Sequence, residues 1–353
     1  MTVARGSDKI SRDNKARHSK VRFMAEKNVQ KVRLAIQWGF LLFSLYLGVT
    51  FYRFVLHFQS GGATPFVARP DGVEAFLPIS GLVSLKGWMT SGAINDVHPA
   101  ALVVLLTVIA VSLLLKRSFC SWICPVSTIT ELCWKAGNKI FGRNFRVWLW
   151  LDWLLRPIKY LLLAFFLFSI LVFMAPDSVG TFITGDYNKM ADVKMLDFFL
   201  HLSGVPLFVI GLLLALSFLY KNPFCRFLCP YGALLGLVSR LSPVKVQRLE
   251  SACISCGGCT KACPSHIDVM HKERVCSEEC VGCLRCVSAC PKPEALQLRT
   301  KKGKVVSGMV YAALVVIFFV GGTLIGRATG HWHSSITKSD YQRLITGGEV
   351  EHP

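Results

Sequence analysis

Two segments of this chain carry the same cysteine pattern, CISCGGCTKACP at residues 253–264 and CVGCLRCVSACP at residues 280–291. In each segment the four cysteines are spaced C-x2-C-x2-C-x3-C, and a proline follows the fourth. Pro264 and Pro291 turn the chain away from the last thiol, while Gly257, Gly258 and Gly282 let the backbone pass close to a bulky inorganic group. Thiols in so dense a pattern indicate an iron–sulfur centre.

The spacing is typical of bacterial ferredoxins, in which the fourth cysteine of each run ligates the cluster of the other run. This rule predicts two [4Fe-4S] ligand sets: Cys253, Cys256, Cys259 and Cys290 for the first, and Cys280, Cys283, Cys286 and Cys263 for the second. Structural zinc is the alternative, because C-x2-C pairs also bind zinc. We favour iron because zinc-binding pairs are usually separated by a dozen or more residues, and disulfides fit the spacing less well.

The rest of the chain is apolar enough to lie in a membrane. Of its 353 residues 52% are hydrophobic, and 24 are phenylalanine. Apolar runs long enough to span a bilayer are expected at about residues 34–54, 100–115, 158–175, 205–220 and 305–325. The predicted fold class is therefore an α-helical integral membrane protein with about five transmembrane helices and a bacterial-type dicluster ferredoxin module.

The basic residues lie in alternate loops. Residues 1–33, 116–160 and 221–304 carry ten, eight and fourteen Lys or Arg, whereas residues 57–99, 177–204 and 327–353 carry two, two and three. The net charge of +19 therefore indicates a bilayer as partner and not a nucleic acid. The positive-inside rule predicts a bacterial inner-membrane protein whose N-terminus and ferredoxin module are cytoplasmic and whose C-terminus is extracytoplasmic. No cleavable signal peptide is visible.

These features predict consecutive domains. They are a basic arm over 1–33, disordered or on the membrane surface; a four-helix membrane domain over 34–245; the ferredoxin module over 246–300; a fifth transmembrane helix over 301–326; and an extracytoplasmic tail over 327–353.

An internal repeat joins KRSFCSWICP at residues 116–125 to KNPFCRFLCP at residues 221–230, and indicates two pseudo-repeated hairpins. Cys120 and Cys124, like Cys225 and Cys229, are four residues apart, so on a helix both thiols of a pair lie on one face. Four converging thiols would suit a third iron–sulfur or metal–thiolate site, and a cytoplasmic disulfide switch less well. The alternative is buried packing cysteines followed by a helix-ending proline. The two remaining cysteines, Cys133 and Cys276, are expected to be bystanders.

Together these motifs resemble the membrane-bound polyferredoxin family. It includes the membrane component of the quinol dehydrogenase serving periplasmic nitrate reductase, the copper-oxidase accessory proteins and the membrane half of the nitrous-oxide reductase electron-donor protein. The resemblance covers roughly residues 34–325 and implies electron transfer between a membrane quinone and clusters or haems, with a redox protein such as a cytochrome c as partner. Departures are the fifth span, absent from the nitrate-reductase component, and the lack of a large extracytoplasmic or flavin-binding domain.

Quinol oxidation needs a proton acceptor, so ionisable residues near the outer ends of spans are candidates. Glu74 lies in a short apolar stretch, with Arg69 placed to orient a quinone oxygen. His98 and His201 precede the second and fourth spans at similar heights in the repeat. A further place is His331 and His333. The alternative is that these side chains are solvated or pair with one another at the surface. Haem is the minority expectation, because no span has two histidines at haem-ligating spacing.

Two functions follow from these features. In the first, the protein is an electron-transfer subunit of a quinol-dehydrogenase type that relays electrons between the quinone pool and redox partners. In the second, it is an accessory or maturation factor that reduces a metal or a thiol during assembly of a respiratory metalloenzyme. A structural scaffold would not explain eight closely spaced cluster ligands.

Overall fold

The computed structural model describes residues 3–347, which are mostly helical. Within this range three helical segments are long and apolar enough to cross a membrane: Asn28–Gln59, Trp150–Phe173 and Gly308–Ala328. A fourth crossing is available if α10 (Ala191–Leu200) and α11 (Gly204–Leu219), which are bent by 76°, form one broken span. The described residues therefore support three or four spans where the sequence predicts about five.

The difference lies mainly in the predicted second span, which is helix α3 (Pro99–Leu115) of 17 residues. At about 1.5 Å per residue it is roughly 25 Å long, less than the ~30 Å hydrocarbon core. Its composition is apolar enough, but Pro99 begins the helix and the helix ends before Lys116, where the first C-x3-C-P segment starts. Length, and not hydropathy, separates this helix from the three longer segments.

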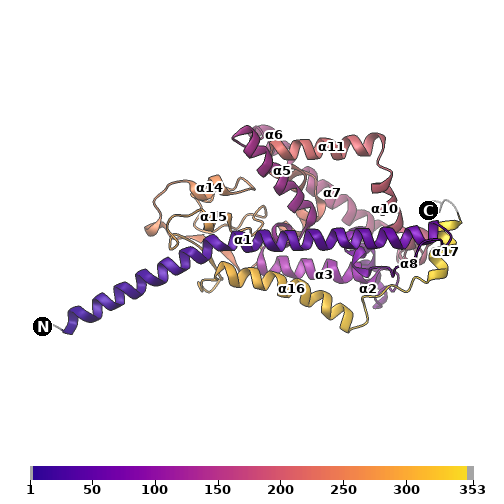
Figure 1. Cartoon of the computed structure of the whole chain (residues 1–353), viewed down its shortest axis with the longest axis horizontal. Helices are drawn as coiled ribbons and strands as arrows, with labels where there is room; N and C mark the ends of the chain where they lie inside the picture. Colours follow the sequence, from indigo (N-terminus) through magenta and orange to yellow (C-terminus); the bar gives the residue numbers. More distant parts are fainter. Residues whose placement is uncertain (1–2, 348–353) are drawn as a thin grey trace. The chain divides into compact units, whose positions relative to one another are not determined.

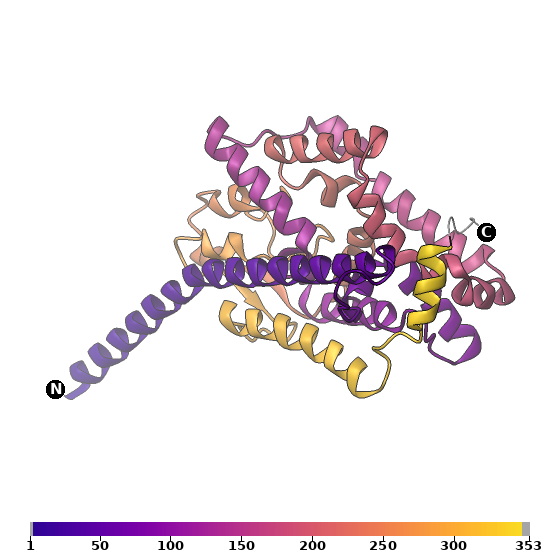
Figure 2. The same ribbon diagram turned by 45° about the vertical axis from the view of Figure 1, so that its right-hand side comes forward.

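Helix α1 (Val3–Gln59) has 57 residues and runs without interruption through the boundary expected at residue 33 (Figures 1 and 2). The expected disordered or surface-lying arm is therefore helical from Val3 onward and continuous with the first span. The helix contains no proline, and its polar half is rich in Lys and Arg, which are good helix formers.

The chain forms two compact units, each built from three separate stretches. Unit 1 comprises residues 1–38, 111–128 and 235–317, and unit 2 comprises residues 39–110, 129–234 and 318–353. This arrangement differs from the consecutive domains that the sequence predicts, because helices α1, α3 and α16 (Gly308–Ala328) each contribute residues to both units.

Unit 1 contains the cysteine-rich module. Strand β1 (Lys245–Arg248) pairs antiparallel with β2 (Leu296–Arg299), with Val246 opposite Leu298. Both of these side chains are buried, so the pairing closes the module with an apolar inner face. The two cysteine runs lie between the strands in sequence and contain the short helices α14 (Gly258–Ala262) and α15 (Arg285–Ser288).

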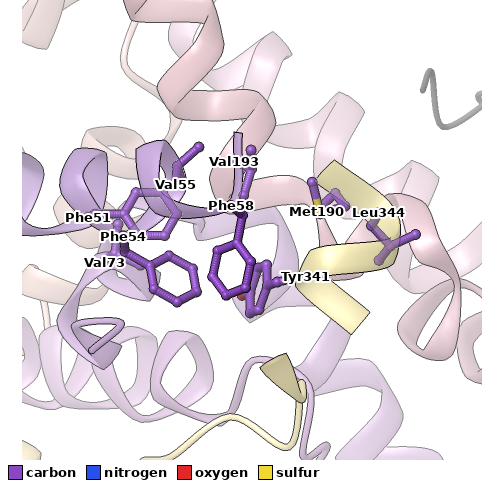
Figure 3. Packing of buried hydrophobic residues seen from close by; sticks show 9 residues of the cluster. All are labelled: Phe51, Phe54, Val55, Phe58, Val73, Met190, Val193, Tyr341 and Leu344. Atoms are coloured by element: carbon purple, nitrogen blue, oxygen red, sulfur yellow. The ribbon is translucent and has the colours of Figure 1, made fainter. Parts of the chain in front are cut away.

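Unit 2 has an aromatic core in which α1 meets the C-terminal helix α17 (Lys338–Thr346) (Figure 3). The Phe54 and Tyr341 rings meet edge to face with centroids 5.0 Å apart. Phe58 stands at the same 5.0 Å from Phe54. Thr337 and Asp340 form a reciprocal capping box that starts α17. The C-terminal segment is thereby an integral part of the core of unit 2.

Seven further helices belong to unit 2. They are the 3₁₀ helix η1 (Asp71–Phe76), α2 (Pro78–Ser91), α6 (Leu149–Leu155), α7 (Ile158–Leu167), the π-helix η2 (Phe168–Phe173), α8 (Pro176–Thr184) and α9 (Asp186–Lys189). Buried Lys86 of α2 donates to the carbonyls of Ile170, Leu171 and Met174. It thereby satisfies backbone acceptors at the end of η2 that no further helical turn can reach.

Candidate functional site

The eight cysteines of the module line two separate cavities. Cys253, Cys256, Cys259 and Cys290 line the first, and Cys263, Cys280, Cys283 and Cys286 line the second. The fourth cysteine of each run therefore lies in the cavity of the other run. The empty volumes, ≈ 360 and ≈ 380 Å³, are similar, as expected for two copies of one motif. The structure brings together the two sets of four that the spacing rule predicts, and cluster ligation by them remains a prediction.

The backbone around each cavity follows the same path. Ser255 and Gly257 in the first run have φ values of 52° and 69°, and Gly282 and Leu284 at the equivalent positions of the second run have 61° and 56°. Alternation between right- and left-handed residues turns successive N–H groups toward a common point and forms anion-binding concavities, which are used in many Fe–S sites. Four thiols and such a backbone fit an anionic cubane.

The four thiols of each set surround a cavity and do not converge on a point. Among the described residues no group of three or more His, Cys, Asp or Glu side chains is placed to hold a single metal ion. A cubane requires the wider arrangement, because each thiolate binds a different iron atom.

The two cavities differ in exposure and electrostatics. At the first site Cys256 is exposed and Cys259 is buried, whereas at the second site Cys263 and Cys283 are buried and none of the four cysteines is exposed. Burial raises the pKa of the Cys283 thiol and raises that of Cys286 further. A backbone hydrogen bond from Ser255, aided by Arg248, lowers the pKa of Cys253. Loading the second site therefore requires the protein to release more tightly held protons.

The two C-x3-C-P motifs have matching local structures, with one correction. Cys120 lies in α4 (Ser118–Trp122) and Cys225 in α12 (Pro223–Phe227), whereas Cys124 and Cys229 follow the ends of these helices. Pro125 and Pro230 then begin α5 (Pro125–Phe141) and α13 (Pro230–Ser239). The prolines start helices and do not end them, as proline at the first helical position favours. The expectation of two thiols on one helical face is wrong, because the helix breaks between them.

His98 and Glu74, two of the proposed proton acceptors, lie together in unit 2. Both side chains are fully buried, and His98 Nδ1 is 3.3 Å from Glu74 Oε1. His98 Nε2 is 2.7 Å from the carbonyl oxygen of Asn188. The second Glu74 oxygen accepts from the backbone N–H of Ala100 at the start of α3, at 2.9 Å.

Arg69 joins this pair to a third buried carboxylate. Its guanidinium donates to Glu74 Oε1 at 3.0 Å and, through Nε and Nη2, to Asp192 Oδ2 at 2.9 and 2.7 Å. The Tyr341 hydroxyl also donates to Asp192, at 3.1 Å. Burial opposes the charge of Arg69, but Asp192, Tyr341 and Glu74 outweigh it and raise its pKa. Arg69 therefore stays charged, as a residue that orients a quinone oxygen would need to be.

His201 and His331 lie outside this network, whereas His333 reaches its edge through Asp71, whose Oδ1 is 3.8 Å from Arg69 Nη1. His201 is 75% exposed and pairs with Asp197 at 2.7 Å. His333 is 76% exposed and pairs with Asp71 at 2.8 Å, while His331 contacts the Thr329 carbonyl. Equivalent positions in the sequence repeat therefore do not give His98 and His201 the same burial: His98 is fully buried and His201 is exposed. Of the remaining cysteines, Cys276 is exposed, with its sulfur 3.7 Å from Lys245 Nζ, and Cys133 is partly buried in α5.

Sequence reasoning missed two members of the network, Asp192 and Tyr341. Asp192 had a usable signal, since it lies in the first turn of a helix that continues as an apolar run. Tyr341 had none, because it reaches the network only through the packing of α17 on α1.

The helices and the paired cysteine cavities define a membrane protein with a ferredoxin-type dicluster module. Two family descriptions match: a 4Fe-4S dicluster domain over residues 245–291, and a 4Fe-4S binding domain over residues 97–144 and again over 202–248. Each of the latter stretches contains one C-x3-C-P motif, in agreement with the internal repeat. No solved structure gives a significant match.

The chain belongs to the 4Fe-4S ferredoxin-type membrane proteins related to YccM, MauN and NapH. It is 42% identical over 332 residues to "Putative electron transport protein YccM" of Escherichia coli (strain K12), covering 90% of this chain and 91% of that protein. It is 31% identical over 156 residues to the methylamine utilization ferredoxin-type protein MauN of Paracoccus denitrificans, covering 42% and 48%. It is 26% identical over 186 residues to the ferredoxin-type protein NapH of Escherichia coli, covering 50% and 58%. The family expectation is confirmed.

Proposed function

We propose that this protein is a membrane-bound iron–sulfur relay that passes electrons between the quinone pool and redox partners, as a subunit of quinol-dehydrogenase type. The observation that carries the proposal is the pair of cavities, each lined by four cysteines with the crossed connectivity of a dicluster ferredoxin. When bound, each [4Fe-4S] cluster supplies one-electron transfer. The relative YccM, named as an electron transport protein, matches 90% of this chain and supports electron transport.

The orientation follows from charge. The basic segments 1–33, 116–160 and 221–304 favour a cytoplasmic location for the N-terminus and the module, and the sparsely charged segments an extracytoplasmic one, in a bacterial inner membrane. An extracytoplasmic or membrane-bound redox protein such as a cytochrome c is the proposed partner.

The His98–Glu74 pair is the proposed proton acceptor. Oxidation of one quinol breaks two O–H bonds and releases two protons and two electrons. One electron goes to each cluster, one proton goes to the His98–Glu74 pair, and the second proton goes to solvent. Because His98 Nε2 faces a carbonyl oxygen, it carries a hydrogen, so a neutral ring would turn a bare Nδ1 toward Glu74 Oε1 at 3.3 Å. A proton held between these two atoms removes the repulsion. Three carboxylates, Glu74, Asp192 and Asp71, face one arginine, so an added proton also offsets part of the excess negative charge of the network.

Replacing Glu74→Gln is expected to slow cluster reduction by a quinol at least tenfold, because loss of a general base typically costs about 10²–10⁴-fold. Reduction by dithionite should be unchanged, since it bypasses proton transfer. The measurement is stopped-flow bleaching of cluster absorbance in purified protein. Asp197→Asn is the matched control, because it alters an exposed His–Asp pair. Equal quinol rates in both variants would remove Glu74 from the mechanism.

The same assay tests the whole proposal. Wild-type protein is expected to show cluster reduction by a quinol. Failure to do so, together with cluster-dependent reduction of a metal ion or thiol without quinone, would establish the maturation function in its place.

The C-x3-C-P cysteines are proposed as ligands of a further iron–sulfur or metal–thiolate site. Both motifs fall in stretches that match a 4Fe-4S binding domain, and Cys229 Sγ accepts from the Gly232 N–H at 3.2 Å, a contact that suits a thiolate. Cys124→Ser and Cys229→Ser should each impair turnover while both ferredoxin signals persist. Iron analysis should give about twelve atoms per wild-type chain if this site is a cubane and about eight without it. Unchanged iron and unchanged turnover would assign these cysteines to packing.

A further inference from the structure

The loop that carries the second cysteine set is bonded from outside the module at three consecutive carbonyls. Ser121 Oγ donates to the Val281 carbonyl at 2.6 Å, and Trp122 Nε1 donates to that of Gly282 at 3.1 Å. Gln30 Nε2 of α1 donates to the Cys283 carbonyl at 2.9 Å. Ser121 and Trp122 are two of the three residues between Cys120 and Cys124. The first C-x3-C-P segment therefore contacts the second cluster site directly.

The loop around Gly282 is tightly packed against Tyr311. A Cβ at Gly282 would lie 2.3 Å from the Tyr311 hydroxyl oxygen, so only glycine fits. The equivalent position of the first run is Ser255, which has a similar positive φ and carries a side chain. The two loops thus differ in their neighbours and not in their local conformation. Tyr311 and Trp122 are both fully buried, with ring centroids 5.9 Å apart.

Two buried basic side chains lie close to the same loop. Arg33, only 1% exposed, donates to the Ser121 carbonyl at 3.1 Å. Lys116, also 1% exposed, has its Nζ 3.4 Å from the Ser277 carbonyl oxygen. Positive charge and low solvent exposure stabilise the added electron on an anionic cluster and shift its potential. The first site is different, because Cys256 and the neighbouring Ile254 are exposed.

We propose that the second site, formed by Cys263, Cys280, Cys283 and Cys286, exchanges electrons with the iron–sulfur site proposed at the C-x3-C-P cysteines, by way of the first C-x3-C-P segment. The exposed first site exchanges them with a redox centre of a partner protein outside the chain. This inference rests on the proposed relay function and specifies the order in which electrons pass between the sites. Each step moves one electron and no proton. Residues 118–122 serve as the junction, with Trp122 as a positioning residue that holds the ligand loop.

The junction is tested with Arg33→Gln in an EPR redox titration with dithionite and mediators, in the absence of quinone. The expected result is a more negative midpoint for one of the two ferredoxin cluster signals, because a buried positive charge is lost. Arg248→Gln, which alters a residue lining the first cavity, should shift the other signal. A shift of both signals or of neither in Arg33→Gln would overturn the proposal. Since no quinone is present, this outcome is independent of the relay function.

The order is tested with Trp122→Phe, which retains an aromatic ring but removes the indole N–H. Quinol-driven reduction of both clusters is expected to slow at least fivefold, with dithionite reduction and both EPR signals intact. Trp134→Phe is the matched control, since it removes the N–H of another buried tryptophan. Gly282→Ser should slow the quinol reaction more strongly. The order would be contradicted if Trp122→Phe reacted with quinol at the wild-type rate. It would also be contradicted if a Gly282→Ser protein lost the second cluster signal but still reduced the first cluster at the wild-type rate. Absence of any quinol reaction in the wild type would instead reject the relay.

Discussion

Replacing Cys256→Ala is expected to abolish one of the two cubane EPR signals and to stop electron flow through the protein, while the protein stays in the membrane. A [4Fe-4S] cluster takes four thiolates, and Cys256 lines the first cavity with three other cysteines. Because Cys256 is exposed, its truncation costs little packing, so the effect should be confined to the cluster. Iron analysis should fall by about four atoms per chain, and the membrane fraction should retain the protein.

Cys276→Ala is the matched control for this experiment. Cys276 is also exposed and lies in the same module, but it is not among the cysteines that line the two cavities. It should keep both signals and full electron flow. Full electron flow and an unaltered iron content in Cys256→Ala would contradict the relay function. Zinc in place of iron in the wild-type protein would show that the cysteines form structural metal sites.

Replacing Arg69→Gln is expected to cost about 3–5 kcal/mol of the free energy of unfolding, because it leaves two buried carboxylates without their cation. Arg69 contacts both Glu74 and Asp192, and the side chains of these acids are fully buried. Tyr341→Phe removes one hydrogen bond to Asp192 and should cost about 1–2 kcal/mol. Thermal unfolding in detergent measures both effects.

The control for Arg69 is Arg343→Gln, since Arg343 pairs with Asp186 at a largely exposed position. Solvent screens such a pair, so its loss should leave the unfolding temperature almost unchanged. Equal stability of the Arg69 and Arg343 variants would mean that the buried network does not form. If Arg69→Gln is destabilised but reacts with quinol at the wild-type rate, the network has a structural role and no role in quinol oxidation.

The grouping of the eight module cysteines was predictable because it follows from local spacing. Cys263 of the first run lines the cavity of the second run, and Cys290 of the second run lines the cavity of the first, as the ferredoxin rule requires. The proton site was predictable only in part. Glu74 was predicted because it is an acidic residue in an apolar stretch, and His98 because it is a histidine just before a predicted span. The same reasoning also selected His201, which is exposed, because a position along a helix does not tell which side faces the protein interior.

The sequence alone determined the membrane class, the crossed cysteine sets and the repeat of the C-x3-C-P motif, because hydropathy, ligand spacing and sequence similarity are local properties. Only the tertiary structure decided that the helix breaks inside each C-x3-C-P motif, that Asp192 and Tyr341 complete a network with Arg69, and that Trp122 holds the loop before Cys283. These contacts join residues far apart in sequence, up to 160 positions for Trp122 and Gly282. Such contacts depend on how helices pack, which no spacing rule encodes.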